Sequence, residues 1–200
     1  MKPNRWNTLI REVPPDRLLD VMAVLYLKTP SEDAVKVMSG LGGDDESSDV
    51  IDKVRLEYHD MFIGSESGAC IPPYESLHRE QRMQGECSEQ VRAAFDREGF
   101  NPAELECEAH WKLIPAPDHL GFELAFLSVL LRSAELSEGE REKLLAAARA
   151  FHAEHIATWA GGYGELLVNT AKTVTYKTLG RLTMAVAEPD FLDCANSPTS

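Results

Sequence analysis

The most informative part of the chain is residues 117–134, which read PDHLGFELAFLSVLLRSA. At about 100° per residue, the leucines of this stretch fall on one face of a helix, and its phenylalanines cover much of the other side. A helix that is apolar nearly all round has to be surrounded by other elements. The stretch therefore predicts a central helix from about Pro117 to Ala134.

Helical periodicity also dominates the rest of the chain, because apolar residues recur at three and four positions and no segment keeps the strict alternation of a strand. We expect an all-α, single-domain helical bundle over residues 1–195, followed by a disordered tail at 196–200. A Ser137–Glu140 capping box is expected to start a helix, and residues 101–117 to form an irregular excursion. The other breakers in the sequence predict helices at about 15–29, 31–40, 48–62, 74–83, 88–98, 137–160 and 171–187.

The charge balance narrows the class of partner. Twenty basic and 33 acidic side chains give a net charge of −13 at pH 7. Such a surface repels phosphate backbones and anionic lipid, which argues against nucleic acid and membrane surfaces and favours a basic partner. No apolar run approaches the roughly 18 residues of a membrane span, and no export signal is recognisable, so we expect a cytoplasmic protein. The four cysteines are expected to be free thiols.

Motifs that carry catalytic chemistry are not found. The chain has no P-loop, no G-x-G-x-x-G pattern and no G-x-S-x-G elbow. His152 and His155 are one helical turn apart, but they do not fit the zinc-peptidase patterns, and Cys107 with His110 would be only half of a tetrahedral zinc site. We predict no catalytic residue and no metal ligand. A metal-dependent or GTP-hydrolysing helical enzyme stays open as the alternative function.

The stretch IPPYES, residues 71–76, is the first of two places where chemistry-bearing residues gather. Pro73 suits the first position of a helix, which puts Glu75 in the first turn. On one interpretation, Glu75 only complements the helix dipole and Tyr74 packs as a staple. On the other, the stretch contributes to a groove for an apolar peptide, lined by Tyr58, Met61, Phe62, Tyr74 and Glu75.

The start of the central helix is the second such place. Glu123 follows His119 by one helical turn, and both lie against an apolar surface where ionisable groups need partners. A structural interpretation makes Asp118 the N-cap and His119–Glu123 a satisfied pair. A functional interpretation makes this a polar pocket that offers Asp118 and Glu123 to a guanidinium group from outside, because carboxylates bind guanidinium through charge-assisted hydrogen bonds.

Four segments together resemble a known family. They are the aromatic-x-x-hydrophobic-Phe-x-Gly pattern at 58–64, the Pro-Tyr-Glu-Ser block at 73–76, the Pro-Asp-His-x-x-x-Glu-Leu-x-Phe-Leu block at 117–127, and Phe-His-x-x-His-x-x-x-Trp at 151–159. In order and spacing, the chain resembles the TorD/DmsD family of redox-enzyme maturation chaperones, which is related to the NarJ-type nitrate reductase assembly proteins.

The resemblance implies an all-helical cytoplasmic chaperone that binds the twin-arginine signal peptide of a molybdopterin-dependent enzyme and holds the apoenzyme back from export until its cofactor is inserted. It implies no resident cofactor, although weak GTP binding has been proposed in the family, and a monomer or a domain-swapped dimer. A NarJ-type protein would instead read the client's amino terminus without export. The expected peptide-binding residues are Tyr58, Met61, Phe62, Pro73, Tyr74, Glu75, Asp118, His119 and Glu123.

A twin-arginine leader would need more than its two charges to bind tightly. Hydrogen bonds to charged groups contribute roughly 1.5–3 kcal/mol each, and ordering a flexible segment costs much of that gain. The apolar stretch that follows the arginines must therefore be buried as well. We expect an acidic cleft with an apolar floor.

Overall fold

The computed structural model describes residues 12–42, 50–64, 68, 70–113 and 116–195. Over these ranges the regular structure is helical, and extended pairing is limited to one isolated antiparallel bridge between Tyr74 and His119. The all-α prediction is confirmed. The α-helices are α2 (Pro15–Leu27), α3 (Glu32–Gly42), α4 (Ile51–Tyr58), α5 (Glu75–Glu80), α6 (Glu86–Glu98), α7 (Ala109–Leu113), α8 (Leu120–Leu136), α9 (Arg141–Phe151), α10 (Ala160–Thr170), α11 (Val174–Val186) and α12 (Phe191–Ala195).

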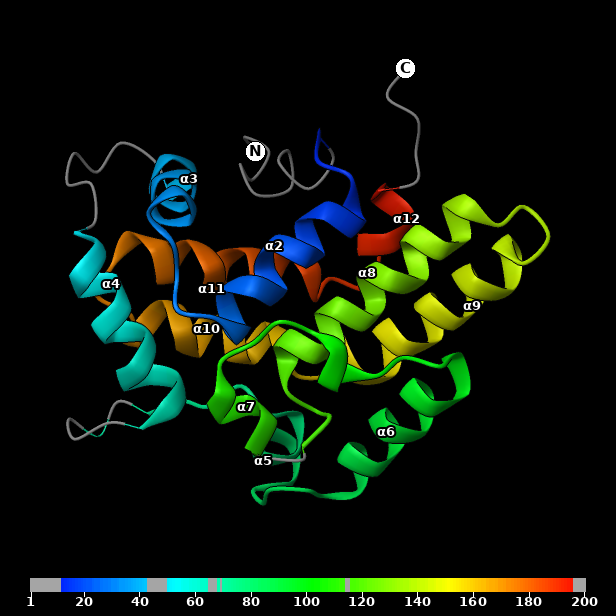
Figure 1. The fold of residues 1–200 in the computed structure, drawn as a ribbon, viewed down its shortest axis with the longest axis horizontal. Helices are drawn as coiled ribbons and strands as arrows, with labels where there is room; N and C mark the ends of the chain where they lie inside the picture. Colours follow the sequence, from blue (N-terminus) through cyan, green and yellow to red (C-terminus); the bar gives the residue numbers. More distant parts are fainter. Residues whose placement is uncertain (1–11, 43–49, 65–67, 69, 114–115, 196–200) are drawn as a thin grey trace.

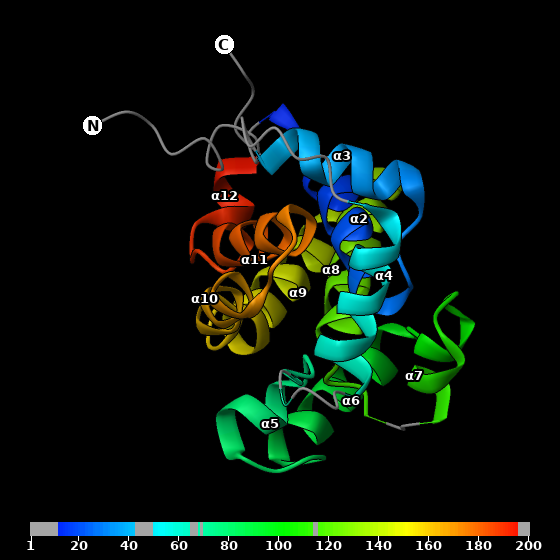
Figure 2. The ribbon, with the colours of Figure 1, turned by 90° about the vertical axis from the view of Figure 1, so that its left-hand side faces the viewer.

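Helix α8 is the predicted central helix, and it crosses the middle of the molecule (Figure 1, Figure 2). Helices α2 and α9 pack along it. The hydroxyl of Ser128 on α8 donates a hydrogen bond of 2.9 Å to the carbonyl oxygen of Asp16 on α2. Leu124 and Leu127 are completely buried, as their place on the leucine face requires. The hydrophobic core extends along the chain from Leu18 to Leu192.

Helices α10 and α11 form a hairpin whose backbones touch. A Cβ atom built on Gly164 would lie 2.6 Å from the carbonyl oxygen of Gly180, and one built on Gly180 would lie 2.7 Å from the carbonyl oxygen of Gly164. No side chain larger than hydrogen fits between two backbones at that distance. Helix α3 packs on the other side of α11.

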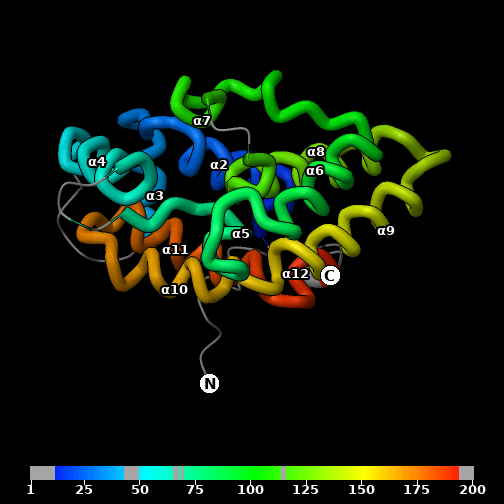
Figure 3. The backbone as a smooth tube through the Cα atoms, turned by 90° about the horizontal axis from the view of Figure 1, so that it is seen from below, coloured from blue at the N-terminus to red at the C-terminus, as the bar shows by residue number. Residues whose placement is uncertain are grey.

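Helices α5 and α6 form a layer at the bottom of Figure 1, and Figure 3 shows this layer from below, with α9 alongside α6. Three-residue and five-residue turns join the longer helices: a 3₁₀ turn at Pro102–Glu104, and π-helical turns that continue α4 through His59–Ile63 and α9 through His152–Ile156. These π-helical turns lie inside two of the segments that carried the family resemblance.

Several predicted boundaries were wrong. The Ser137–Glu140 capping box does not form, because the amide of Ser137 bonds to Ser133 and completes the last turn of α8, while Glu140 precedes α9 without a side-chain cap. Helix α10 was not predicted, since its glycines suggested a break. Short helix α7 lies inside the stretch expected to be irregular, and α12 was not predicted either. The predicted tail at 196–200 lies outside the described residues.

Two further findings concern membrane spans and the cysteines. Within the described ranges, no helix combines the length and the apolar character that crossing a bilayer requires. Cys70, Cys87 and Cys107 are free thiols, as expected.

Candidate functional site

The predicted aromatic wall of the peptide groove lies in the hydrophobic core. Tyr58, Met61 and Phe62 are each at most 1% exposed. The phenol of Tyr58 accepts a hydrogen bond of 2.9 Å from the indole of Trp111 and donates one of 3.3 Å to the carbonyl oxygen of Tyr26. Phe62 packs edge-on against Tyr58, with ring centroids 5.4 Å apart. In this structure these side chains hold α4 to α2 and α7, so the prediction that they line an open groove was wrong.

The predicted proline and acidic residues form a junction between α5 and α8, which we call the α5–α8 junction. The carbonyl oxygen of Asp118 accepts from the amide of Glu75 at 2.9 Å, and the carboxylate of Asp118 accepts from the amide of Ser76 at 2.8 Å. In return, the amide of Leu120 donates to the carbonyl oxygen of Pro73 at 2.8 Å. Asp118 therefore caps the first turn of α5 from a distant part of the chain, where a negative charge favours the helix dipole.

His119, and not Asp118, is the N-cap of α8. Its Nδ1 accepts a hydrogen bond of 3.1 Å from the amide of Gly121, and its ring packs against Tyr74, Trp111 and Phe122. Complete burial lowers the pKa of His119 to about 3, with a smaller contribution from His110. The imidazole is therefore neutral at pH 7, and the predicted His119–Glu123 pair does not form.

Three carboxyl groups, those of Glu75, Asp118 and Glu123, are fully buried at this junction, and we call them the buried carboxyl cluster. Burial raises the pKa of Glu123 well above its ordinary value of 4.5, and the negative charges of Glu75 and Asp118 raise it further. The burial of Glu123 thus favours its protonated form. Glu75 has two side-chain partners, the guanidinium of Arg79 and the Nδ1 of His155, which lies 2.9 Å from its Oε2.

The structure thus brings Tyr74, Glu75, Asp118, His119 and Glu123 together, as the sequence suggested, but seals them inside. All nine predicted peptide-binding residues are buried, and none of them lines either of the two cavities described below. The prediction that Asp118 and Glu123 are open to a guanidinium was wrong for this conformation. The physical reason is that Asp118 completes the start of α5, while Glu123 is fully buried in a site that favours its neutral form.

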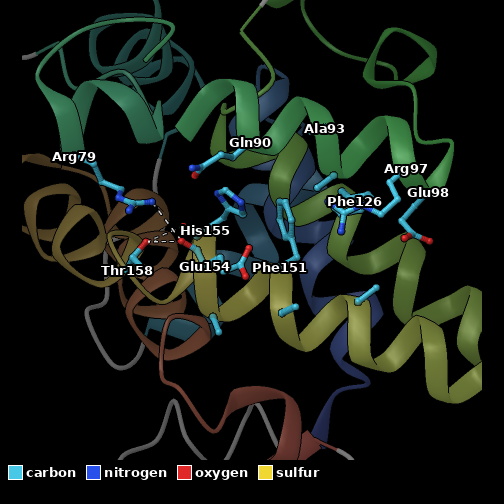
Figure 4. A pocket seen from close by; sticks show the side chains of 14 residues that line it. Arg79, Gln90, Ala93, Arg97, Glu98, Phe126, Phe151, Glu154, His155 and Thr158 are labelled. Atoms are coloured by element: carbon cyan, nitrogen blue, oxygen red, sulfur yellow. Dashed lines mark hydrogen bonds between the residues drawn. The ribbon is translucent and has the colours of Figure 1, made fainter. Parts of the chain in front are cut away.

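An open groove lies between α6 and α9, and we call it the α6–α9 groove (Figure 4). Its volume is about 760 Å³. One wall is a single face of α6, with residues at helical spacing from Gln90 to Glu98, and the other is a single face of α9 and the turn after it. The groove is lined by Arg79, Gln90, Ala93, Ala94, Arg97, Glu98, Phe126, Ala147, Ala150, Phe151, Ala153, Glu154, His155 and Thr158.

Alanines and phenylalanines shape this groove. Phe126 and Phe151 form the floor with ring centroids 4.8 Å apart, and Phe95 packs beneath them at 4.8 Å from Phe126. The alanines of both walls end at Cβ and leave the space between the helices unfilled. The rim is polar and of mixed charge, because Arg97 and Glu98 lie on α6 and Glu154 lies opposite. Such a groove can take an apolar segment and bind polar groups at its edges.

The α6–α9 groove and the buried carboxyl cluster meet at one end. Arg79 and His155 both line the groove, and both contact Glu75 behind its wall. The sequence reading missed the groove, although a signal was present: small residues recur at helical spacing at Ala93 and Ala94, and at Ala147 and Ala150. A smaller cavity of about 240 Å³ lies by α7 and Pro102, away from this end.

A family model and a solved structure are similar to this chain. The family model described as nitrate reductase delta subunit matches residues 20–163, well over half of the chain and including all four segments that carried the resemblance. A crystal structure of a candidate redox enzyme maturation protein from Archaeoglobus fulgidus is 22% identical and covers 85% of this chain and 91% of its own, with a TM-score of 0.49. No individually curated protein shows significant similarity. The match over residues 20–163 shows that the chain belongs to the nitrate reductase delta-subunit family, the NarJ-type relatives of the TorD/DmsD redox-enzyme maturation chaperones.

Proposed function

We propose that this protein binds the amino-terminal leader of a molybdenum-dependent oxidoreductase in the α6–α9 groove and keeps the apoenzyme from premature assembly until its cofactor is inserted. Family membership carries the general part of this proposal, since the family is one of maturation chaperones for redox enzymes. The groove carries the specific part. The protein would act in the cytoplasm, where the client still bears its leader, and it would act by binding and not by catalysis.

The groove suits an apolar segment of a peptide. Its floor is aromatic, its walls expose Ala93, Ala150 and Ala153, and its volume is in the usual range for a ligand site. An amphipathic helix or an extended apolar stretch laid between two helices would bury its apolar side chains against Phe126 and Phe151, which is the groove mode of peptide recognition. The floor already packs as part of the core, so it needs little rearrangement to receive a ligand.

The charge of the chain supports a basic ligand. With a net charge of −13, the protein attracts a positively charged leader over a distance of about a Debye length, and this attraction raises the association rate more than the affinity. The apolar stretch of the leader would then supply most of the binding free energy. Two kinds of client fit this description: an exported enzyme with a twin-arginine leader, and, as the nitrate reductase family model favours, an enzyme whose terminus is read without export.

Calorimetric titration with synthetic leader peptides tests the proposal. Ala150→Asp and Ala93→Asp each put a carboxylate on the apolar wall, and we expect either to weaken the leader by about tenfold or more, equal to about 1.4 kcal/mol. Ala146→Asp is the matched control, because Ala146 is on the same helix α9 but does not line the groove. Equal affinities for all three variants and the native chain would refute the groove as the leader site.

The client type needs a second comparison. A peptide with both arginines replaced by lysines and one with its apolar stretch shortened separate the two contributions. A twin-arginine client predicts that both changes weaken binding. A client read without export predicts that only the shortened apolar stretch matters.

A further inference from the structure

Arg79 connects the open groove to the buried carboxyl cluster. Its side chain is 36% exposed and lines the groove, whereas its partner Glu75 is completely buried. The guanidinium donates to Oε1 of Glu75 and, at 3.3 Å, to the carbonyl oxygen of Glu154 on the opposite wall (Figure 4). The guanidinium therefore fills the opening through which the groove would otherwise reach Glu75.

The cluster behind this opening has more acidic side chains than basic ones among the described residues. Glu75, Asp118 and Glu123 face Arg79 and His155 among the described residues. Both carboxyl oxygens of Glu123 are fully buried, and neither accepts a hydrogen bond from a donor in the described part of the chain. A buried carboxyl group without donors is an unusual cost in a folded protein. The site thus holds one guanidinium of its own and retains unsatisfied acceptors for a guanidinium that reaches deeper.

We propose that Glu75 is the guanidinium-binding subsite of the α6–α9 groove, occupied by Arg79 in the free chaperone and taken over by an arginine side chain of the client leader. This proposal rests on the proposed function and names the side chain that the groove selects. Arg79 then acts as an internal competitor. It swings out into solvent when the client arginine enters, and the contact with the carbonyl oxygen of Glu154 is exchanged in the same way.

An exchange of this kind is physically favourable for arginine alone. Removing the cation from a buried carboxylate is costly, but replacing one guanidinium by another conserves the charge and the hydrogen bonds at Glu75. Nη1 of Arg79 makes both contacts, to Oε1 of Glu75 and to the carbonyl oxygen of Glu154, and a client arginine brings the same planar, weakly hydrated guanidinium, whereas a lysine ammonium is a strongly hydrated point charge that is more costly to bury. The competition also lowers the apparent affinity of the client, because only the fraction of molecules with Arg79 displaced can bind.

Peptide titration of the Arg79→Ala variant is the first test. Because the competitor is gone, we expect a leader with two arginines to bind several-fold more tightly than it binds the native chain, while its lysine counterpart changes much less. Arg82→Ala is the control: Arg82 also carries a guanidinium near α5, but it pairs with Glu80 and does not line the groove. Its affinities should match those of the native chain.

A small cation tests the subsite without any client. Millimolar methylguanidinium should raise the melting temperature of Arg79→Ala in a saturable manner, as a ligand that binds only the folded state does. Methylammonium at the same concentration should not, and neither cation should stabilise the native chain or Arg82→Ala. If Arg79→Ala does not fold, Arg79→Lys replaces it: lysine keeps the charge but makes fewer bonds, so the arginine peptide should still gain affinity.

Three results would overturn the proposal: unchanged or weaker binding of the arginine peptide, an equal gain for the arginine and lysine peptides, or no difference between methylguanidinium and methylammonium. The cation assay also distinguishes a failure of the proposed function from a failure of the guanidinium subsite. A native chain that binds no leader, together with a selective response of Arg79→Ala to methylguanidinium, refutes the proposed function and retains the subsite. Leader binding that Ala150→Asp abolishes, without any arginine preference, does the opposite.

Discussion

The α10–α11 hairpin and the α5–α8 junction are both buried, yet different forces hold them. In the hairpin, two backbones touch at Gly164 and Gly180, and shape alone determines the fit. In the junction, Asp118 caps a helix across the chain, His119 stays neutral, and burial raises the pKa of Glu123. The contrast shows where this fold can respond to its surroundings. The hairpin has no titrating group at its closest contact, whereas the junction depends on protonation and borders the groove.

The largest effect is expected in the hairpin. Gly164→Ala places a Cβ 2.6 Å from the carbonyl oxygen of Gly180, and backbone cannot move aside cheaply. We expect a loss of about 3 kcal/mol in the free energy of unfolding, measured by urea denaturation and unchanged between pH 5 and pH 8. Gly162→Ala, on the same helix with open space around its Cβ, should instead gain up to about 1 kcal/mol. Similar stabilities for the two variants would mean that the helices can separate at little cost.

The second-largest loss of stability is expected in the α5–α8 junction. Asp118→Ala leaves the amide of Ser76 without its acceptor at the start of α5, and we expect a loss of about 2 kcal/mol. Asp118→Asn keeps a carbonyl oxygen that can accept the same bond, so less than half of that loss is expected. Thermal melts of the two variants side by side measure the difference. If asparagine and alanine cost the same, the carboxylate charge and not the hydrogen bond is what α5 requires.

A pH titration sharpens the comparison. The pKa of His119 falls from 6.5 to about 3 on folding, so the unfolded chain binds a proton first as the pH drops. The contribution of His119 to native stability should therefore fall from about pH 6.5 downwards, at a rate that approaches about 1.4 kcal/mol per pH unit. His119→Asn keeps an N-cap for α8 but cannot titrate. Its stability should depend less steeply on pH in that window, whatever its absolute value at pH 7; parallel curves would count against the neutral histidine.

The smallest expected effect on stability comes from Glu123, and it appears as the pH rises. Because folding raises the pKa of Glu123 above 4.5, the folded chain keeps a proton that the unfolded chain releases. The contribution of Glu123 to native stability should decrease as the pH rises above about 4.5, until the pH passes the pKa of this group in the folded state. Glu123→Gln donates a hydrogen bond without titrating, so the difference in stability between variant and native chain should shift in favour of the variant with rising pH. Guanidinium denaturation at pH 5, 7 and 9 measures this, and a difference that stays constant would show that Glu123 is ionised in the fold.

The central helix was predictable because a long apolar stretch between a proline and a charged end permits few alternatives. Helix α10 was not, since the same glycines that allow its contact with α11 weaken its local helical signal. For the site, the sequence indicated that Glu75, Asp118, His119 and Glu123 belong together, and it misjudged their orientation. Whether a carboxyl group faces solvent or a helix terminus depends on the partner, here Ser76, and spacing along the chain does not reveal that partner. The groove exists because small side chains line both of its walls. A hydrophobic pattern shows which residues are apolar but hardly shows how much space they leave.

The alanine walls of the α6–α9 groove have a consequence for how such a protein diversifies. Ala93, Ala150 and Ala153 are exposed and support neither the core nor a hydrogen bond network. Exchanges at such surface positions usually change folding stability by no more than about 0.5 kcal/mol, yet each would reshape the space offered to a ligand. Recognition can therefore drift, or be engineered, one methyl group at a time on an unchanged scaffold, and a duplicated copy could acquire a new client before losing its fold.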